Sequence, residues 1–256
     1  MFKTIFTNSS GILTSRLLGF VRDMLTASAL GASVYSDIFF VAFKIPNLFR
    51  NIFAEGAFSQ SFIPTLAASK DKWLFSADVF IKLFSLIFLF SLFITLFQNV
   101  VVEIFAFGYS AETKALAAPI IAINFYYLDL IFIVTFLGAL LQYRKHFAVT
   151  AFATALLNVG MIATLLIFKN SAPMTIVYAL SFGVLIGGCL QALAHIFVAK
   201  KKKVLLGLYI GFRKFFRGKR SPDSKRFNAG FLPSIAGSST AQIAAFVDTW
   251  LATFLG

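Results

Sequence analysis

The residues best suited to chemistry are the charged and polar side chains that interrupt residues 5–65, an otherwise apolar stretch near the start of the chain. They are Arg16, Arg22, Asp23, Asp37, Lys44, Asn47, Arg50 and Glu55. At membrane depth an ionisable group costs at least ~2.5–3.5 kcal/mol on insertion scales, so it is expected to face a protein interior or a water-filled cavity. So many such groups in two adjacent segments favour a functional lining over ion pairs that only fix helix packing.

Their spacing supports a shared lining if both segments are helices. Arg16 and Asp23 are seven residues apart, which keeps them on a narrow stripe of one helix face. Asp37 and Lys44 have the same separation on the second segment. Arg16 and Arg22 lie about 9 Å apart along the helix axis, at ~1.5 Å per residue. The pattern therefore favours a charged face on each of the two helices.

The residue types favour an anionic ligand. Arginine presents a planar fork of donors that matches phosphate and carboxylate groups, and Asn47 lies three residues before Arg50 on an adjoining face. Three arginines with only partial compensation by acids predict a cavity for an anion, for which a diphosphate is the best candidate. Asp23, Asp37 and Glu55 can hold the arginines in place, or exchange them as the cavity opens and closes.

The elements that must position these residues are transmembrane helices. Of the 256 residues, 59% are hydrophobic, 34 are Phe and only 13% are charged, whereas soluble domains carry roughly 25% charged residues. Seven segments reach the length of about 20 mostly apolar residues that a membrane span needs. Their expected ranges are 5–29, 35–65, 76–105, 115–141, 147–168, 174–199 and 229–255. The chain is therefore predicted to be an all-α polytopic membrane protein with about seven transmembrane helices.

These segments fall into three parts. Residues 1–199 hold six helices of one lobe, residues 200–226 form a basic cytoplasmic loop, and residues 227–256 hold the seventh helix. A cytoplasmic N-terminus places sixteen Lys and Arg residues on that side and two, Lys114 and Lys169, on the other. Because Lys and Arg mark the cytoplasmic face, we expect the N-terminus inside and the C-terminus outside. If the chain is part of a transporter that rocks one helical bundle against another, we expect that it holds the first bundle and that the second lobe is missing from it.

The formal charge of +13 comes mostly from residues 200–226, which hold eleven Lys and Arg residues and one acid, Asp223. A basic run alone is a weak motif for nucleic acid. A basic loop beside membrane spans is more simply explained by contact with anionic lipid headgroups, so we expect anionic membrane lipids and no nucleic acid as partners. Residues 204–216 mix apolar side chains with Arg213 and Lys214, as an amphipathic helix in the membrane interface does.

Three motifs carry a resemblance to a known family. They are SRLLGFVRD at residues 15–23, DIFFVAFKIPNLFR at residues 37–50 and FAEGAFSQSFIP at residues 53–64. Together they resemble the signature of the MurJ/MviN family, the bacterial lipid II flippases of the multidrug/oligosaccharidyl-lipid/polysaccharide exporter superfamily. The match is nearly free of gaps over residues 9–66 and looser afterwards, where Gln242-Ile243 and Val247-Asp248-Thr249 also fit.

The resemblance implies one lobe of a two-lobe, alternating-access transporter in the bacterial inner membrane. Its cargo would be lipid II, an undecaprenyl-diphosphate with a disaccharide-pentapeptide, moved from the cytoplasmic to the periplasmic leaflet for peptidoglycan synthesis. The resemblance also implies that Arg16, Arg22, Asp37 and Arg50 serve transport, with the arginines facing the diphosphate. Only about half of the family's chain is present, so we expect this half to be inactive alone.

Two further acids and several alternatives remain. Asp248, inside the seventh segment, is a candidate Na⁺ or proton site whose other ligands would come from the second lobe. No other cofactor is expected, and Na⁺, proton or membrane-potential coupling all stay open. Asp129 is expected to pair within the bundle, for example with Lys82. The rival functions are export of another lipid-linked oligosaccharide or a small cationic drug, and a non-transporting scaffold for wall synthesis. An enzyme is disfavoured because the sequence shows no metal cluster or nucleophile elbow.

Overall fold

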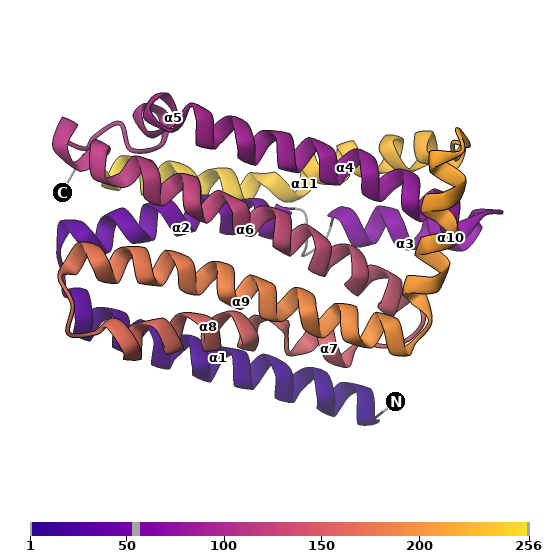
Figure 1. Ribbon diagram of the computed structural model, residues 1–256, viewed down its shortest axis with the longest axis horizontal. Helices are drawn as coiled ribbons and strands as arrows, with labels where there is room; N and C mark the ends of the chain where they lie inside the picture. The colour runs from indigo at the N-terminus through magenta and orange to yellow at the C-terminus, as the bar shows by residue number, and fades with distance from the viewer. Residues whose placement is uncertain (1, 53–56, 255–256) are drawn as a thin grey trace.

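The chain folds into long helices joined by short turns (Figure 1). The computed structural model describes residues 2–52 and 57–254, and within these ranges it contains no strand. The helices are α1 (Phe2–Leu30), α2 (Val34–Ile52), α3 (Phe58–Ala68), α4 (Lys72–Leu96), α5 (Gln98–Phe105), α6 (Ala111–Tyr143), α7 (Ala148–Ala151), α8 (Ala153–Phe168), α9 (Pro173–Lys201), α10 (Val204–Phe216) and α11 (Asp223–Ala252). The predicted all-α class is confirmed.

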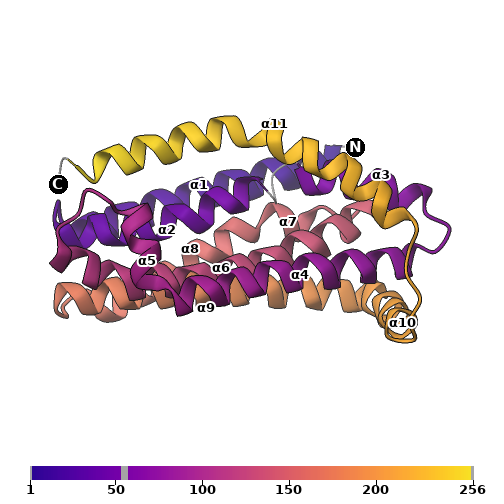
Figure 2. The same cartoon turned by 90° about the horizontal axis from the view of Figure 1, so that it is seen from above.

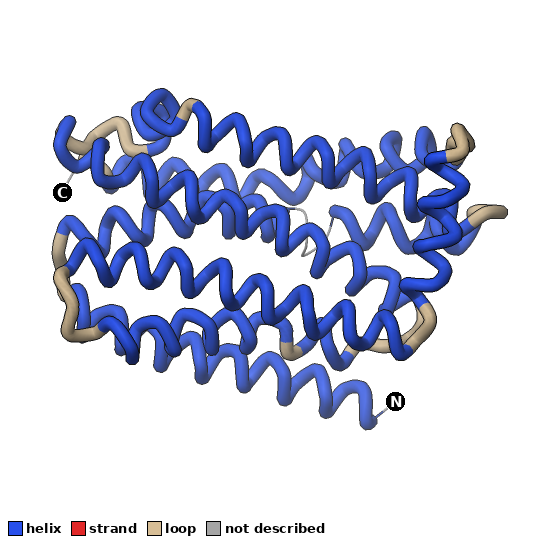
Figure 3. Tube along the Cα trace, viewed as in Figure 1, coloured by secondary structure: helices blue, strands red, loops and turns tan. Residues whose placement is uncertain are grey.

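The long helices lie side by side, and the turns gather at the two ends of the bundle (Figure 3). The two ends of the chain lie at opposite ends of the bundle (Figure 1), as an odd number of membrane crossings requires. Helix α10 crosses the end at which the chain begins (Figure 2). The basic segment and the N-terminus therefore share one side, which is the arrangement that the count of Lys and Arg residues requires.

Helix α11 lies as a layer of its own along one side of the bundle, opposite α9 (Figure 2). It packs mainly against α3 and α2, and more weakly against α4. The hydroxyl groups of Ser61 on α3 and Ser234 on α11 approach to 3.3 Å. At the far end of α11, Trp250 Nε1 donates to the carbonyl oxygen of Ile104 (3.0 Å). Polar contacts in its first half and near its last turn therefore hold this helix to the rest of the lobe.

Three helices are long and apolar enough to cross a membrane among the described residues: Lys72–Leu96, Ala111–Tyr143 and Pro173–Lys201. Helix Ala153–Phe168 is apolar but shorter. The predicted single segment 35–65 is two helices, α2 and α3. The segment 76–105 breaks at Phe97 and 147–168 breaks at Phe152, because at each position the backbone leaves the regular helix. Seven crossings stay a prediction.

Glycines set the close approach of α8 and α9, which share the most extensive helix contact in the lobe. A Cβ atom on Gly160 of α8 would lie 2.5 Å from the backbone nitrogen of Gly187. A Cβ on Gly187 itself would lie 2.7 Å from the Cα of Leu157. Gly183 and Gly187 are four residues apart on α9, a spacing of small residues that lets membrane helices approach closely.

Phenylalanines fill the end of the bundle near α10. Phe58 and Phe62 of α3 stack with ring centroids 4.9 Å apart, and both lie against Phe136 of α6 and Phe227 of α11. All four rings are almost fully buried. Because offset and edge-to-face aromatic pairs add to the area that they bury, this cluster joins α3, α6 and α11 where the chain turns most often.

A helix occupies Val204–Phe216, the range expected for an amphipathic helix. Gly207 and Gly211 of α10 pack against Trp73, while Leu206 and Tyr209 are exposed on its other side. An apolar face that remains exposed at the end of a membrane bundle is typical of an interfacial helix. Its place in the membrane interface stays a prediction.

An ion pair ties α10 to the turn before α4. Lys214 Nζ lies 2.6 Å from Asp71 Oδ2, and Asp71 also accepts a hydrogen bond from the backbone N–H of Leu74. Burial alone would raise the pKa of Asp71, but the Lys214 hydrogen bond and the Leu74 N–H outweigh it and hold this pKa below its usual value. The charged carboxylate therefore stabilises the docking of α10.

Candidate functional site

Arg50, near the end of α2, lines a polar cavity inside the lobe. Its Nε donates a hydrogen bond to Oδ1 of Asn47 (2.7 Å), which confirms the expected contact between these two residues of one helix. The cavity has a volume of about 190 Å³. Its polar lining comes from six helices and is formed by Arg50, Ser59, Thr135, Gln142, Thr150, Thr154 and Gln191. Among the described residues that line it, none is acidic, and Arg50 is the one charged residue of that set.

The inner wall of this cavity carries buried polar atoms. Oγ1 of Thr150 and Nε2 of His195 are both buried without a hydrogen-bond partner among the described residues. They meet at Gly138, where a Cβ atom would lie 3.3 Å from Thr150 Oγ1 and 3.7 Å from His195 Nε2. Gln191 instead donates its Nε2 to the carbonyl oxygen of Ala153 (2.7 Å). A polar ligand or water in the cavity would satisfy groups that the protein leaves unpaired.

Arg22, on α1, lies in a different set of contacts. It forms an ion pair with its neighbour Asp23 (2.7 Å) and donates Nη1 to Oδ1 of Asn158 on α8 (2.9 Å). Asn158 is buried and returns a hydrogen bond from Nδ2 to the carbonyl oxygen of Ser15 (3.0 Å). Arg22 therefore helps to pack α1 on α8, which is the packing role weighed above for these charges. The side chain of Asp23 is 56% exposed and remains accessible to a ligand.

The remaining predicted residues of the first two helices are less constrained. Arg16 is exposed on α1, and Asp37 is exposed in the first turn of α2, while Lys44 is half-buried. Burial raises the pKa of the Tyr109 hydroxyl, and the Asp37 carboxylate raises it further, so these two side chains lie near each other. Glu55 lies outside the described residues.

The structure thus brings together two pairs, Arg22 with Asp23 and Arg50 with Asn47. No hydrogen bond or ion pair joins the two pairs among the described residues whose contacts are given. The physical reason is the packing of their helices: α1 lies mainly against α8, and α2 lies mainly against α6. A shared lining of α1 and α2 stays a prediction.

The two other acids behave differently from each other. Asp248 on α11 is exposed, and no group of three or more potential metal ligands of the His, Cys, Asp or Glu type occurs in the described part of the chain. Its role as a Na⁺ site stays a prediction. The expected pairing of Asp129 with Lys82 is wrong, because Lys82 pairs with Asp78 one helical turn earlier (2.8 Å). Asp129 is buried beside Ser91.

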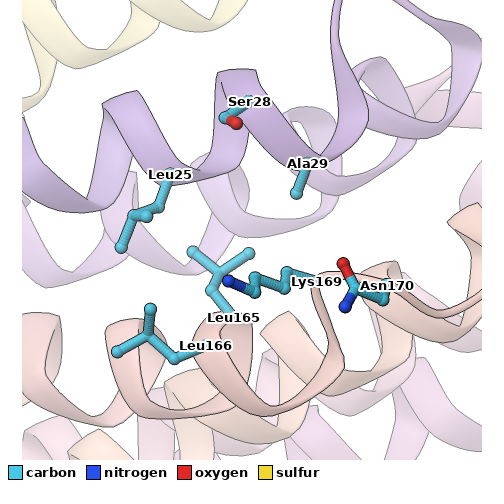
Figure 4. Close-up of a pocket in the computed structure, with 7 residues that line it drawn as sticks. All are labelled: Leu25, Ser28, Ala29, Leu165, Leu166, Lys169 and Asn170. Carbon is cyan, nitrogen blue, oxygen red and sulfur yellow. The ribbon is translucent and has the colours of Figure 1, made fainter.

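A second pocket lies between the end of α1 and the end of α8 (Figure 4), two helix ends that lie at the opposite end of the bundle from α10 (Figure 1). Its volume is about 280 Å³. Figure 4 shows Leu25, Ser28 and Ala29 of α1 across from Leu165, and the Lys169 amine reaching along the gap. None of the predicted site residues lines it.

Residues that sequence reasoning missed line the cavity of Arg50. They are Gln142, Thr150, Thr154 and Gln191, with His195 lying behind Gly138 of the lining, and each is a single polar residue in an apolar segment. Each alone is common in membrane helices, and only the fold shows that they converge. A usable signal is that Gln191 and His195 are one helical turn apart on α9, and so share a face.

Comparisons with known proteins agree on one family. Residues 26–256 match the family model described as "Lipid II flippase MurJ". A "Probable lipid II flippase MurJ" from Helicobacter pylori is 48% identical over 241 residues, which cover 90% of this chain and 52% of the relative. A "Lipid II flippase MurJ" from Burkholderia cenocepacia is 36% identical over 264 residues, covering 100% of this chain and 50% of the relative.

A solved structure supports the same fold. The "Lipid II flippase MurJ, inward closed conformation" matches with a TM-score of 0.78 and 23% sequence identity. The match covers 97% of this chain and 51% of that one. The chain spans about half the length of the curated relatives that it matches.

Proposed function

The chain belongs to the lipid II flippase MurJ family, and from that premise we propose that it forms the N-terminal lobe of an alternating-access transporter. The proposed cargo is lipid II, carried by its undecaprenyl diphosphate from the cytoplasmic to the periplasmic leaflet. The chain is a multi-pass protein of the inner membrane. The second lobe would supply the surface against which this lobe rocks, so the N-terminal half is proposed to be inactive alone.

The observation that carries this proposal is the cavity of Arg50. A guanidinium beside neutral polar groups, which are the other polar residues described in the lining of this cavity, is suited to an anion. Charge-assisted, bidentate hydrogen bonds to phosphate are stronger than neutral ones and fix geometry. Asn47 accepts a hydrogen bond from Nε of Arg50, which orients the guanidinium whose donors are proposed to engage the phosphate.

Arg16 and Arg22 are proposed to contribute at a second position along the path of the diphosphate. Arg16 is exposed on α1, and it can reach cargo without breaking a contact given for it. The Arg22–Asp23 pair supports an exchange mechanism, in which the carboxylate holds the guanidinium until a phosphate replaces it. Asp37 and Glu55 are proposed to hold arginines of the transport path in the same way until cargo replaces them.

The orientation and energy source follow from charge. We propose a cytoplasmic N-terminus, because the basic segment and the start of α1 lie at the same end of the bundle (Figure 1) and Lys and Arg favour the cytoplasmic face. Asp248 is exposed on α11, where a second lobe would complete a Na⁺ or proton site. Coupling to one of these ions or to the membrane potential is part of the proposal.

The rival functions make different predictions. An exporter of another lipid-linked oligosaccharide would use the same arginines. A cationic drug would need an acidic lining, and the described residues that line the cavity of Arg50 include no acid. A non-transporting scaffold would tolerate loss of Arg16 or Arg50. The relatives are named as flippases and not as enzymes.

The proposal is tested by supplying the missing half. Residues 1–256 are joined to the second half of the Helicobacter pylori relative, which is 48% identical over the shared region. The fusion and the chain alone are expressed in a strain depleted of its own lipid II flippase, with membrane abundance checked by immunoblot. The full-length relative serves as the positive control.

We expect the fusion to restore growth and the chain alone to fail at equal abundance. Growth with the chain alone would contradict the need for a second lobe. If the full-length relative restores growth and the fusion does not, at equal abundance, the proposed cargo is wrong for this lobe. A fusion that restores growth but also exports an unrelated lipid-linked oligosaccharide equally well would favour the rival within the superfamily.

A further inference from the structure

A basic pocket opens at the end of the bundle where α1 begins, apart from the cavity of Arg50. It has a volume of about 450 Å³ and lies between the first turns of α1, the α6–α7 turn and the end of α9. Its lining is formed by Thr7, Lys145, His146, Phe147, Ala148, Val149, Phe197, Val198, Lys201 and Lys202. The pocket has no residue in common with the cavity of Arg50.

The polar side of this pocket is cationic and uncompensated. Lys145, Lys201 and Lys202 come from two separate segments, and His146 adds a fourth nitrogen base. Within the described ranges no acid lines the pocket, and none of the three lysines forms an ion pair there. Three amines that converge without a carboxylate create a local positive field that an anion would neutralise.

The other side of the pocket is apolar. Phe147 and Val149, at and after the α6–α7 turn, and Phe197 and Val198 of α9 supply its apolar lining, and Phe197 is 69% exposed. A soluble anion gains nothing from such a wall. An amphiphile with a charged head and an apolar chain matches both sides, because its head can meet the lysines while its chain lies along α9.

The walls of the pocket are fixed before any ligand binds. Arg144 Nη1 donates to the carbonyl oxygen of Lys202 (3.0 Å), which ties the α6–α7 turn to the end of α9. The Arg144 guanidinium also lies over the ring of Trp73 (5.4 Å). Lys145 has a φ of 61°, a left-handed conformation that usually favours glycine at the end of a helix. The backbone of Lys145 is therefore held by its surroundings in a conformation that is strained for any residue other than glycine.

We propose that this pocket binds the headgroup phosphate of an anionic phospholipid, with an acyl chain against Phe197. Basic pockets between membrane helices at the cytoplasmic surface are suited to anionic headgroups. The proposal rests on the chain being embedded in a bilayer and not on lipid II transport, so the two can fail separately. The ligand is a lipid of the bilayer, such as phosphatidylglycerol, and not free phosphate.

The test uses a tryptophan in the pocket and lipids that quench it. Phe197→Trp is introduced into the full chain, which is placed in nanodiscs of phosphatidylcholine. Brominated phosphatidylglycerol or brominated phosphatidylcholine is then added in steps, and the quenching is compared with that of the parent chain, which reports the two native tryptophans. Site binding shows as quenching at low phosphatidylglycerol that the brominated phosphatidylcholine does not reproduce.

A charge-matched pair of variants separates the pocket from the basic loop. In the first, Lys145, Lys201 and Lys202 are changed to Gln. In the second, three exposed residues outside the pocket, Arg217, Lys219 and Lys225, are changed to Gln. We expect the first variant to weaken the phosphatidylglycerol response roughly tenfold and the second to change it about twofold or less.

Equal loss in both variants would overturn the proposal, because a diffuse basic surface would then explain the response. Displacement of the quenching lipid by millimolar inorganic phosphate at constant ionic strength would also overturn it, since the site would then take free phosphate. If the triple variant does not fold, the single change Lys201→Gln at an exposed position replaces it. An unchanged response of that folded variant contradicts the proposal, and a partial loss supports it.

Discussion

The contact between α1 and α8 depends on one buried amide, Asn158, and its loss should be measurable. Asn158 is 2% exposed and makes two hydrogen bonds to α1, one from Arg22 Nη1 (2.9 Å) and one to the carbonyl oxygen of Ser15 (3.0 Å). Asn158→Ala removes both and leaves the Arg22 guanidinium with Asp23 as its remaining strong partner. The variant therefore separates packing of α1 from the charge of Arg22, which stays in place.

The expected cost follows from the two bonds. Hydrogen bonds to charged groups contribute about 1.5–3 kcal/mol in water-soluble proteins, whereas hydrogen bonds between membrane helices average about 0.6 kcal/mol. One bond of the first type and one to a backbone carbonyl should together contribute about 1–3 kcal/mol to the free energy of unfolding. Asn158→Asp keeps the acceptor for Arg22 and loses the donor to Ser15, so its cost should be smaller.

The assay is equilibrium unfolding of the purified chain in mixed micelles with increasing SDS, followed by circular dichroism. Asn170→Ala is the matched control, because Asn170 is exposed just beyond α8. We expect the control to leave the free energy of unfolding unchanged. If Asn158→Ala also leaves it unchanged, the two hydrogen bonds do not hold α1 to α8, and the packing role given to Arg22 is wrong.

The remaining predictions concern helix packing, acid and topology. Gly187→Val should lower the free energy of unfolding by at least ~1–3 kcal/mol in the same assay, because a side chain there meets the α8 backbone. The control is the same change at an exposed glycine, where a side chain meets no neighbouring helix and a smaller loss is expected. The Asp71–Lys214 pair should stabilise the docking of α10 fully above the usual carboxylate pKa of about 4, and this stabilisation should be lost as pH falls through the lower pKa of the folded state. Amide hydrogen exchange of α10 measured against pH would show the loss, and Asp71→Asn should abolish this pH dependence. Single cysteines at Lys114 and Lys169, in a chain without the native cysteine, should react with a membrane-impermeant reagent from outside, and labelling of either only from the cytoplasm would refute the topology.

The sequence predicted the fold class and family because both are carried by strong, redundant signals. A charge-poor chain with long apolar segments has few folds other than membrane helices, and the motifs around Arg16 and Arg50 are long enough to be specific. The helix at Val204–Phe216 was predicted from its mixture of apolar and basic residues. The breaks at Phe97 and Phe152 were not predicted. Phe152 is as apolar as its neighbours, whereas Gln98 and Asn99 directly after Phe97 are a polar signal that the prediction of a single span did not use.

The site was predicted in part. The i, i+3 contact of Asn47 with Arg50 follows from helix geometry and was predicted. Partners from distant segments were not, because nothing in the residues near Arg22 indicates Asn158, which lies 136 positions away. The pairing proposed for Asp129 failed for a related reason, since Lys82 found a closer partner in Asp78 on its own helix. Local periodicity predicts contacts within a helix, and tertiary packing decides the rest.

The central claim, that Arg50 recognises the diphosphate of the cargo, is tested most directly by measuring affinity. The fusion protein described above is titrated with a short-chain lipid II in detergent, as the parent and as Arg50→Ala, Arg50→Lys and Arg220→Ala. A lost charge-assisted hydrogen bond contributes about 1.5–3 kcal/mol, so Arg50→Ala should weaken binding by roughly 10–100-fold. Arg50→Lys should restore part of it, and Arg220→Ala, in the basic segment, should change it little. Parent-like affinity of a folded Arg50→Ala fusion would contradict the account.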